Sequence, residues 1–126
     1  MSTTAVRRYE VGARSSGTFG RVLWSCRGQH FVADGPVHNG CPGEAVTPAE
    51  LFLAGIAACG VELVEVIARD EGVAVGGARV EIEGEIDPAS PVREDVTVFN
   101  RVRLTFELEG VGEDEAARLV ERFKRR

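Results

Sequence analysis

The longest apolar stretch of the chain, LFLAGIAACGV at residues 51–61, has no charged or strongly polar side chain on any face of a helix. A helix that is apolar on all sides is normally enclosed by protein. The residues ahead of the stretch are typical of a helix N-terminus: Thr47 suits the cap, Pro48 suits the first helical position, and Glu50 completes a capping box with Thr47. The pattern predicts a central helix that ends near residues 70–72.

Short β-forming stretches alternate with turns before this helix. They occur at about residues 5–11, 18–24 and 29–33, and the third ends at the turn sequence Asp34-Gly35-Pro36. We predict three strands that pair as a meander. The sequence that follows, GPVHNGCPGEAV, is rich in glycine, proline and asparagine, so we expect a loop that leads to the helix cap.

Two stretches after the helix alternate with the period of a strand. Residues 80–86 carry valine or isoleucine on one face and glutamate on the other, and residues 96–108 carry apolar residues opposite threonine, arginine and glutamate. The acidic face of the first could pair with the partly basic face of the second across an antiparallel ladder. Residues 113–126 are acidic at the start and basic at the end, as the helix dipole prefers, and predict a helix that is apolar at Ala116, Leu119, Val120 and Phe123.

The predicted order of elements is βββ-α-ββ-α, which defines an α+β fold of antiparallel strands around a buried central helix. We expect the 126 residues to form a single domain, residues 1–126. An all-apolar helix in so small a chain also suggests a dimer. A membrane span is not expected, because it needs about 20 apolar residues and this run is closed by four charged residues, Glu62, Glu65, Arg69 and Asp70.

Charge and composition exclude several classes of partner. The net charge is −5, the pI is near 5.1 and the basic residues do not gather into one stripe, so we expect no nucleic-acid partner. The first residues, MSTTAVRRYEV, lack the apolar core of a signal peptide, and we therefore expect a cytoplasmic protein. No phosphate-binding loop, dinucleotide fingerprint, G-x-S-x-G or H-E-x-x-H motif occurs, so no cofactor is expected.

The three cysteines, Cys26, Cys41 and Cys59, are expected to be thiols in a reducing compartment. Cys59 is the leading functional candidate because it ends the apolar part of the central helix. The alternative is that it is an inert core residue, which is the usual role of a cysteine in an apolar helix. Cys59 lies too far from the helix N-terminus for the helix dipole to stabilise a thiolate, so activation would need a cation from elsewhere.

Two further features bear on the thiols. Gly55 and Gly60 flank Cys59, although each glycine costs a helix interior about 1 kcal/mol relative to alanine, so we expect either close packing of another element or access for a substrate. Cys26, His30, His38 and Cys41 offer zinc-ligating residue types at irregular spacing. The alternative, which we favour, is that they are strand and loop residues without a metal.

The sequence resembles the OsmC/Ohr proteins, bacterial thiol-dependent peroxidases for organic hydroperoxides and their many relatives. The resemblance rests on HFVADGP at residues 30–36, the glycine-rich loop, and TPAELFLAGIAAC at residues 47–59, which is similar to the family's stretch ending in its reactive cysteine. The later strands and the terminal helix follow in the family's order. Nearly the whole chain is covered.

The resemblance implies an intertwined homodimer with buried central helices and active sites at the subunit interface. It implies that the Cys59 thiolate attacks the peroxide O–O bond and becomes a sulfenic acid. A glutamate and an arginine assist the thiol in the hydroperoxide-specific members. Glu50 and Arg21 are the candidates here, although Glu50 stands one position later than the family's glutamate, and Arg14 and Arg27 are further basic residues in or beside the N-terminal strands.

Family members of the peroxidase type form a disulfide with a second cysteine in a C-P-V-like stretch after the last helix, and residues 113–126 contain no such stretch. The sulfenic acid would therefore be reduced by an external thiol, or Cys41 or Cys26 would take the part of the second cysteine. The predicted function is reduction of organic hydroperoxides through Cys59 in oxidative stress defence. The rival hypothesis is a non-catalytic dimer that binds a small hydrophobic ligand, with Cys59 as a packing residue or redox sensor.

Overall fold

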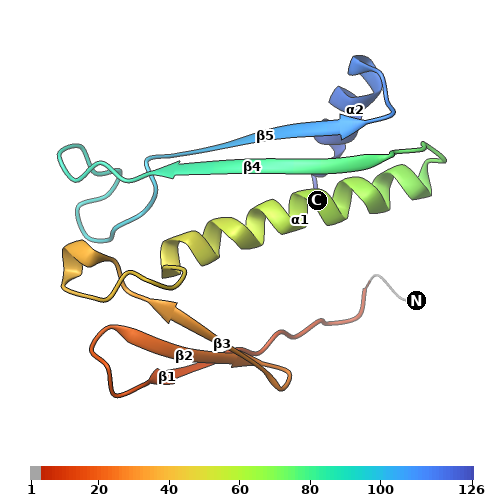
Figure 1. The fold of residues 1–126 in the computed structure, drawn as a ribbon. Coiled ribbons are helices and arrows are strands. Elements are labelled where there is room, and N and C mark those ends of the chain that lie inside the picture. The colour runs from red at the N-terminus through yellow and green to blue at the C-terminus, as the bar shows by residue number, and fades with distance from the viewer. Residues whose placement is uncertain (1–3) are drawn as a thin grey trace. The chain divides into compact units, whose positions relative to one another are not determined.

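The computed structural model describes residues 4–126, and the chain divides into two compact units, Met1–Leu51 and Phe52–Arg126. The order of elements in Figure 1 is βββ-α-ββ-α with a short 3-10 turn before the first helix, so the predicted α+β order is confirmed. The single domain that we expect over residues 1–126 stays a prediction.

The first unit holds an antiparallel meander of β1 (Gly12–Ser15), β2 (Arg21–Cys26) and β3 (Gln29–Asp34), as predicted. Arg27 and Gly28, with φ of 50° and 78°, form the two-residue turn between β2 and β3. Positive φ at both central residues is the geometry of a tight hairpin turn, because it matches the twist of the flanking strands. This turn sets the register in which Arg21 lies opposite Asp34 and Cys26 opposite Gln29.

The predicted strand at residues 5–11 is wrong, because the first strand begins only at Gly12. The reason is the register of β1 on β2. Gly12 pairs with Ser25, one residue before β2 ends at Cys26, so residues 5–10 run past the end of β2 and find no strand to pair with. β-forming side chains alone do not make a strand without a partner for the backbone.

The central helix, α1 (Pro48–Asp70), has the predicted bounds. Its capping box is reciprocal: the Glu50 N–H donates to the Thr47 hydroxyl at 3.3 Å, and the Thr47 N–H donates to Glu50 Oε1 at 2.9 Å. These bonds satisfy two backbone donors that the first turn of a helix otherwise leaves unpaired. Before the cap lies a 3-10 turn, η1 (Val37–Asn39), within the predicted loop.

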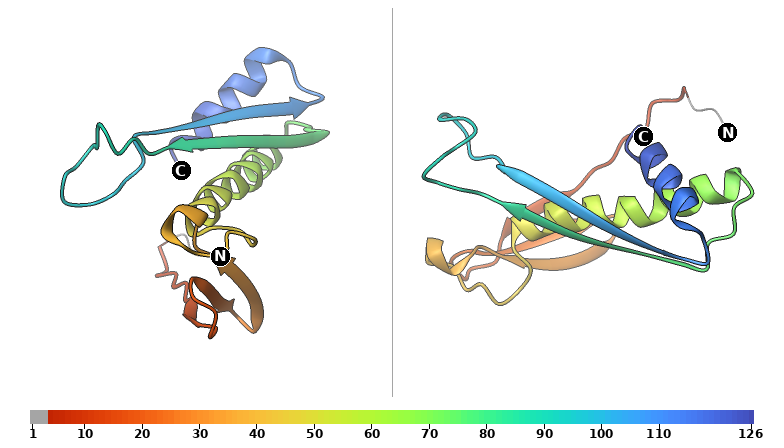
Figure 2. Two further views of the ribbon diagram at one scale, coloured as in Figure 1. Left: turned by 60° about the vertical axis from the view of Figure 1, so that its left-hand side comes forward. Right: turned by 90° about the horizontal axis from the view of Figure 1, so that it is seen from above.

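The second unit packs a β-hairpin and a terminal helix against α1 (Figures 1 and 2). The hairpin consists of β4 (Gly77–Glu85) and β5 (Arg101–Glu109), and the terminal helix is α2 (Glu113–Phe123). Figure 2 shows α2 beside the C-terminal half of α1. The core is formed there by buried residues of both helices and by half-buried neighbours from the hairpin: Val64, Ile67, Ala68, Leu119, Phe106 and Leu108.

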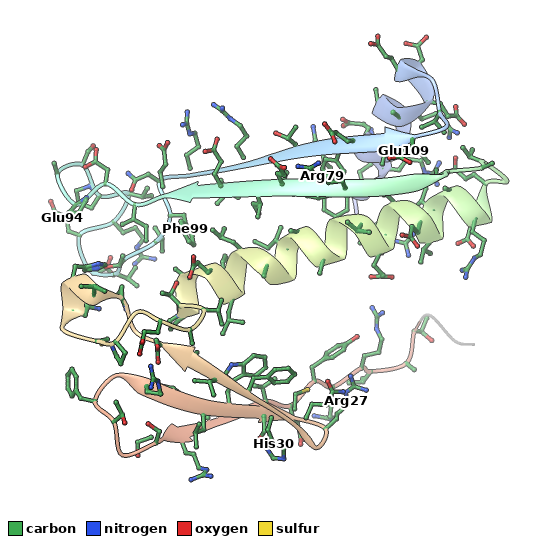
Figure 3. All side chains as sticks on the ribbon, viewed as in Figure 1. Arg27, His30, Arg79, Glu94, Phe99 and Glu109 are labelled. Atoms are coloured by element: carbon green, nitrogen blue, oxygen red, sulfur yellow. The ribbon has the colours of Figure 1, made fainter. Side chains whose placement is uncertain are left out.

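The predicted charge ladder on the hairpin is confirmed. Glu85 pairs with Arg101 at 2.7 Å, Glu83 with Arg103 at 3.6 Å, and Arg79 with Glu107 at 3.8 Å. These pairs lie on the exposed face of the sheet, where Figure 3 labels Arg79. Each such pair contributes about 0.2–1 kcal/mol, so they orient the strands and indicate no site.

The second predicted strand after the helix begins later than expected, at Arg101 instead of Val96. β4 ends at Glu85, so residues before Arg101 have no strand opposite them. They belong to a loop that Asn100 holds together, because its side chain accepts from the Asp87 N–H at 2.8 Å and donates to the Ser90 carbonyl at 2.7 Å. The alternating valines of this segment indicated a strand that the hairpin register does not allow.

Burial along α1 is confined to one stripe. Its buried residues are Gly60, Val64, Ile67 and Ala68, whereas Phe52 near the N-terminal end is 60% exposed. Residues 51–61 of the helix are therefore apolar on every side but are not enclosed on every side, because the hairpin and α2 cover only part of the helix surface. Among the described residues, α1 is also the one helix long and apolar enough to cross a membrane, a test that core helices of soluble proteins also pass. Our expectation of no membrane span stays a prediction.

Candidate functional site

Cys59 is exposed on α1 and lines a groove of about 440 Å³ in the second unit. One wall of the groove is a stripe of α1 and the other comes from α2 and the residues after it. The residues that line the groove are Phe52, Gly55, Ile56, Cys59, Leu63, Phe123, Lys124 and Arg126.

The α1 wall follows from helical periodicity. Phe52, Ile56, Cys59 and Leu63 are spaced by three or four residues and therefore share one face of the helix. The core residue Gly60 lies about 100° further around, on the neighbouring stripe. Since residues 51–61 of α1 are apolar on every side, one apolar stripe packs against the hairpin while the adjacent apolar stripe carries the thiol.

The two glycines that flank Cys59 have different surroundings. A Cβ at Gly60 would lie 3.3–3.4 Å from side-chain atoms of Val80 and Phe106, so this glycine allows the hairpin to approach α1 closely. A Cβ at Gly55 would meet nothing within 4 Å. Close packing of the hairpin therefore explains why residue 60 is a glycine. No such packing within the chain explains Gly55, which has open space beside it.

Phe52, at the N-terminal end of the groove, is held by Phe99 from the loop between β4 and β5. The two rings are stacked with centroids 5.8 Å apart and planes inclined by 18°. Phe99, labelled in Figure 3, itself lies close to Gly84 and Leu53, because a Cβ at Gly84 would come within 2.6 Å of the Phe99 ring and 3.2 Å of Leu53. The loop thus fixes one wall of the groove.

Cations lie at the α2 side of the groove. Phe123 packs its ring on Phe106 at a centroid distance of 5.4 Å, which fixes the end of α2. The next turn continues from there, with the Lys124 N–H bonded to the Val120 carbonyl at 3.1 Å and the Arg126 N–H to the Phe123 carbonyl at 3.0 Å. Lys124 and Arg126 therefore form the rim of a groove that is otherwise apolar apart from the thiol, and Lys124 Nζ also pairs with Glu121 at 3.5 Å.

The first unit contains a network of charged residues around Arg21. Its Nε and Nη2 atoms donate to the two carboxylate oxygens of Asp34 at 2.8 and 3.0 Å, and Nη2 also donates to Glu44 at 2.8 Å. Asp34 is fully buried and accepts two more bonds at Oδ2, from the backbone N–H groups of Glu44 and Ala45. The network fixes the guanidinium and the loop before α1 together.

The ionisation of both partners follows from these bonds. The Arg21 guanidinium, followed by the backbone N–H of Ala45, holds the pKa of Asp34 far below its usual range despite burial of the carboxylate. Hydrogen bonds to Asp34 and then to Glu44 raise the pKa of Arg21 above its already high ordinary value. Asp34 is therefore an anion that orients a permanent cation.

The predicted site residues fall in different parts of the chain. Cys59 lies in the second unit and Arg21 in the first. Glu50 is engaged in the capping box, where the backbone N–H and then the hydroxyl of Thr47 lower its pKa. The glutamate that pairs with Arg21 is Glu44. Arg14 lies on β1, and Arg27 occupies the β2–β3 turn.

Glu44 and Asp34 were not identified from the sequence as partners of Arg21. Asp34 ends a strand before Gly-Pro and Glu44 follows a glycine, so both read as ordinary loop residues. The one signal available was the pairing of β2 with β3, whose register sets Arg21 opposite Asp34. The cationic rim at Lys124 and Arg126 was also not foreseen, because it depends on where α2 packs.

The other two cysteines lie at opposite ends of the β2–β3 hairpin. Cys26 adjoins the turn, near which Figure 3 shows Arg27 and His30. Cys41 lies at the other end, where Cβ atoms built at Gly20 and Gly35 would come within 2.5 and 2.4 Å of its sulfur. Within residues 4–126 no group of three or more His, Cys, Asp or Glu side chains is placed to hold a metal ion, so Cys26, His30, His38 and Cys41 do not form one site.

Comparison with known proteins identifies the family. The family model described as OsmC-like protein matches residues 41–126, and the chain therefore belongs to the OsmC-like family. This confirms the resemblance seen in the sequence. The comparison with curated protein sequences gives no match.

Solved structures share the fold. An OsmC-like protein from Mycoplasma pneumoniae superposes with a TM-score of 0.80 at 16% identity over 95% of this chain and 82% of that chain. An organic hydroperoxide resistance protein from Elizabethkingia anophelis gives 0.78 at 17% identity over 98% and 85%. An organic hydroperoxide resistance protein OsmC from Legionella pneumophila gives 0.75 at 24% identity over 97% and 85%. At these identities the likeness establishes the fold.

Proposed function

We propose that the protein is a thiol-dependent peroxidase that reduces organic hydroperoxides through Cys59, in defence against oxidative stress. The observation that carries the proposal is the exposed thiol of Cys59 in an apolar groove with a cationic rim. A thiol needs contact with the peroxide, and an apolar wall suits an organic substituent. Membership of a family whose solved structures include organic hydroperoxide resistance proteins supports the same function.

The chemistry begins with the thiolate sulfur of Cys59. It attacks one oxygen of the O–O bond, so that an S–O bond forms and the O–O bond breaks. The sulfur is oxidised to a sulfenic acid while the peroxide takes up two electrons and leaves as an alkoxide, which accepts a proton to become the alcohol. An external thiol then displaces water from the sulfenic acid to give a mixed disulfide, and a second thiol releases Cys59.

An external reductant fits this chain better than an internal one. Cys41 is only partly exposed, and its sulfur fills the space left by Gly20 and Gly35, so its release would require the Gly35–Gly43 loop to open. Cys26 lies at the far end of the same hairpin from Cys41. We therefore propose one-cysteine turnover with an external thiol.

We further propose that Arg21 is the cation that assists Cys59, with Glu44 as its exposed partner instead of Glu50. Asp34 fixes the orientation of the guanidinium, and Glu44, whose side chain is 77% exposed, shares only Nη2. Among the described residues, Nη1 makes no hydrogen bond, so its two N–H groups remain available as donors. Glu50 keeps its role at the helix cap.

A homodimer is part of the proposal. The chain exposes 9561 Å², whereas a compact monomer of this mass exposes about 6,600 Å², and two separate units about 7,900 Å². The excess is accompanied by exposed large apolar residues such as Tyr9, Phe19 and Phe52. A second copy of the chain would remove this surface from water.

The test follows oxidation of Cys59 by cumene hydroperoxide and by hydrogen peroxide at pH 7, with a mass readout of sulfenic acid and mixed disulfide. The wild type is compared with Cys59→Ser and with the control Cys26→Ser. We expect fast oxidation confined to Cys59 and a preference for the organic peroxide. Oxidation no faster than that of a free thiol, and unchanged in total by Cys59→Ser, would overturn the peroxidase.

The rival function is binding of a small hydrophobic ligand without catalysis, and the apolar lining of the groove favours it. Binding of an apolar fluorescent probe that is displaced by aliphatic compounds, in a protein whose Cys59 reacts no faster than a free thiol, would support this rival. Rapid oxidation of Cys59 by the organic peroxide would exclude it as the main function.

A further inference from the structure

We infer that Cys41 is a positioning residue for Arg21, because its side chain lies between the two backbone segments that carry Arg21 and its buried partner Asp34. The inference rests on the proposed function in so far as Arg21 assists Cys59. The contacts that carry it all lie within the first unit. They consist of close packing and hydrogen bonds, so they do not depend on which residues of that unit are exposed.

Cys41 packs against the residues next to the ion pair. Gly20 directly precedes Arg21, and Gly35 directly follows Asp34. A Cβ built at Gly20 would lie 2.6 Å from the Cβ of Cys41, and one built at Gly35 would lie 2.9 Å from it. The sulfur of Cys41 is closer still to each built atom. The side chain of Cys41 therefore fills the space beside both glycines and sets how closely the two segments approach it.

The backbone of Gly35 does not require a glycine. Gly20 has a φ of 77°, which by itself favours glycine, whereas Gly35 does not have a positive φ. At Gly35 the atoms nearest to a built Cβ are the sulfur and the Cβ of Cys41, followed by the Gly20 carbonyl oxygen at 3.6 Å. The lack of a side chain at residue 35 is thus matched to the side chain of Cys41.

Backbone hydrogen bonds join the same segments. The Gly35 N–H donates to the Gly20 carbonyl at 2.8 Å, and the Gly43 N–H donates to the Gly35 carbonyl at 3.1 Å. The Cys41 N–H donates to the Pro36 carbonyl at 3.3 Å, which closes the loop over Gly35. Gly35 is therefore bonded through its N–H and its carbonyl, and Cys41 is held against it.

The ion pair begins one residue away from these contacts. Because the peptide unit is planar and rigid, a shift of Gly20 or Gly35 passes to the neighbouring residue. Arg21 and Asp34 meet in two parallel hydrogen bonds of 2.8 and 3.0 Å, and such a bidentate pair is specific in its geometry. A larger side chain at residue 41 would push the two segments away from it and displace the guanidinium.

The experiment observes Arg21 directly in the full-length protein. Its Nε–H donates to Asp34, and the cross-peak of this group in a proton–nitrogen correlation NMR spectrum is assigned by its absence in Arg21→Lys. Spectra are recorded for Cys41→Ser, which keeps the size of the side chain, and for Cys41→Leu, which enlarges it. Cys26→Leu is the matched control, because Cys26 is also partly buried but adjoins the turn at the far end of the same hairpin.

We expect the Arg21 cross-peak to shift or broaden in Cys41→Leu and to keep its position in Cys41→Ser and in Cys26→Leu. The rate of Cys59 oxidation by cumene hydroperoxide should fall about tenfold or more in Cys41→Leu, because a misplacement of about 1 Å can cost about a hundredfold in rate. An unchanged cross-peak in Cys41→Leu, or an equal change in Cys26→Leu, would overturn the inference. If Cys41→Leu fails to fold, Cys41→Val, with a smaller side chain, decides in the same way.

A double replacement tests the match between the two residues. Gly35→Ala alone should displace the Arg21 cross-peak, because its methyl group enters the space of the Cys41 sulfur. Cys41→Gly combined with Gly35→Ala removes this overlap and should return the cross-peak toward its wild-type position. An equal displacement in the single and the double variant would show that the two residues act independently and would overturn the inference.

The two readouts separate this inference from the proposed function. A displaced cross-peak together with slower oxidation of Cys59 in Cys41→Leu supports both. A displaced cross-peak with unchanged oxidation retains Cys41 as the residue that positions Arg21 and overturns the assistance of Cys59 by Arg21. A cross-peak that stays in place in Cys41→Leu, in a protein whose Cys59 is oxidised fast, retains the peroxidase and overturns the inference.

Discussion

The guanidinium of Arg21 binds the carboxylate of Asp34 through two parallel hydrogen bonds of 2.8 and 3.0 Å. The carboxylate is fully buried, and it also accepts the backbone N–H groups of Glu44 and Ala45. One side chain therefore fixes both the direction of the cation and the course of the loop that leads to α1.

Replacement of Asp34 should destabilise the first unit more than replacement of Glu44. Asp34→Asn removes the charge from four hydrogen bonds and leaves Arg21 with one carboxylate, whereas Glu44→Gln alters a side chain that is 77% exposed. Thermal unfolding of the two variants side by side measures the difference. Equal midpoints for Asp34→Asn and wild type would show that the network does not hold the loop.

The same network predicts a dependence of stability on pH. The pKa of Asp34 is lowered in the folded state, so the unfolded chain binds the proton more readily. The stabilisation is complete above the ordinary aspartate pKa of about 3.9 and is lost as the pH falls through the lowered value of the folded protein. Urea titrations from pH 6 down to pH 2 should show a loss that is smaller in Asp34→Asn. Parallel curves for the two proteins would contradict this.

Glu50 and Glu44 should differ in their effect on the thiol. Glutamine also completes a capping box, so Glu50→Gln should leave stability and the oxidation rate of Cys59 nearly unchanged, whereas Thr47→Ala should cost about 1 kcal/mol. Glu44→Gln should change the oxidation rate, because Glu44 shares the guanidinium of Arg21. Stopped-flow oxidation of Cys59 by cumene hydroperoxide measures the rate in Glu50→Gln and in Glu44→Gln. A large loss in Glu50→Gln alone would restore Glu50 as the assisting carboxylate.

The glycines that flank Cys59 should respond differently to alanine. Gly55→Ala should raise the free energy of unfolding by up to about 1 kcal/mol, because a helix gains an alanine where there is room for it. Gly60→Ala should gain less or lose stability, because its methyl group would press on Val80 and Phe106. Urea denaturation of the matched pair measures the contrast, and an equal gain in both variants would show that the hairpin yields without cost.

The positive charges at the rim of the groove should make Cys59 react faster with an anionic disulfide reagent than with a neutral one. The anionic disulfide 5,5′-dithiobis(2-nitrobenzoate) should react with Cys59 faster, relative to neutral 2,2′-dithiodipyridine, at low salt than at high salt. Lys124→Ala with Arg126→Ala should lower that ratio by about 1.4- to 5-fold, the range of an exposed charge interaction. Arg79→Ala, on the outer face of the hairpin, serves as the control. A fall of the same size in this control would assign the effect to net charge alone.

The sequence indicated the helices more reliably than the strand ends, and the reason is physical. The start of α1 is encoded locally, by Thr47, Pro48 and Glu50, and the structure places it there. The start of β1 and the start of β5 depend on where the partner strand ends, at Cys26 and at Glu85. The sequence of residues 5–11 or 96–100 does not show where the partner strand ends.

The candidate site shows the same contrast between features that are visible locally in the sequence and features that depend on long-range contacts. Cys59 was identified because a single thiol in an apolar helix is visible in the sequence, and the family stretch ends there. The partners of Arg21 and the cations of the rim are brought in by contacts across 13, 23 or more positions of the chain. That packing within the chain explains Gly60 and does not explain Gly55 could be decided only from their neighbours in space.

The position of Cys41 also makes it an intrinsic reporter. Its sulfur occupies the space beside Gly20 and Gly35 and is only partly exposed, so displacement of the loop from Gly35 to Gly43 should increase its access to a reagent. When the loop opens and closes fast, the part of the alkylation rate of Cys41 that depends on this opening is the fraction of molecules with the loop open multiplied by the rate constant of a free thiol. Alkylation of Cys41 would thus report on local opening in the first unit, independently of the thiol of Cys59 in the second.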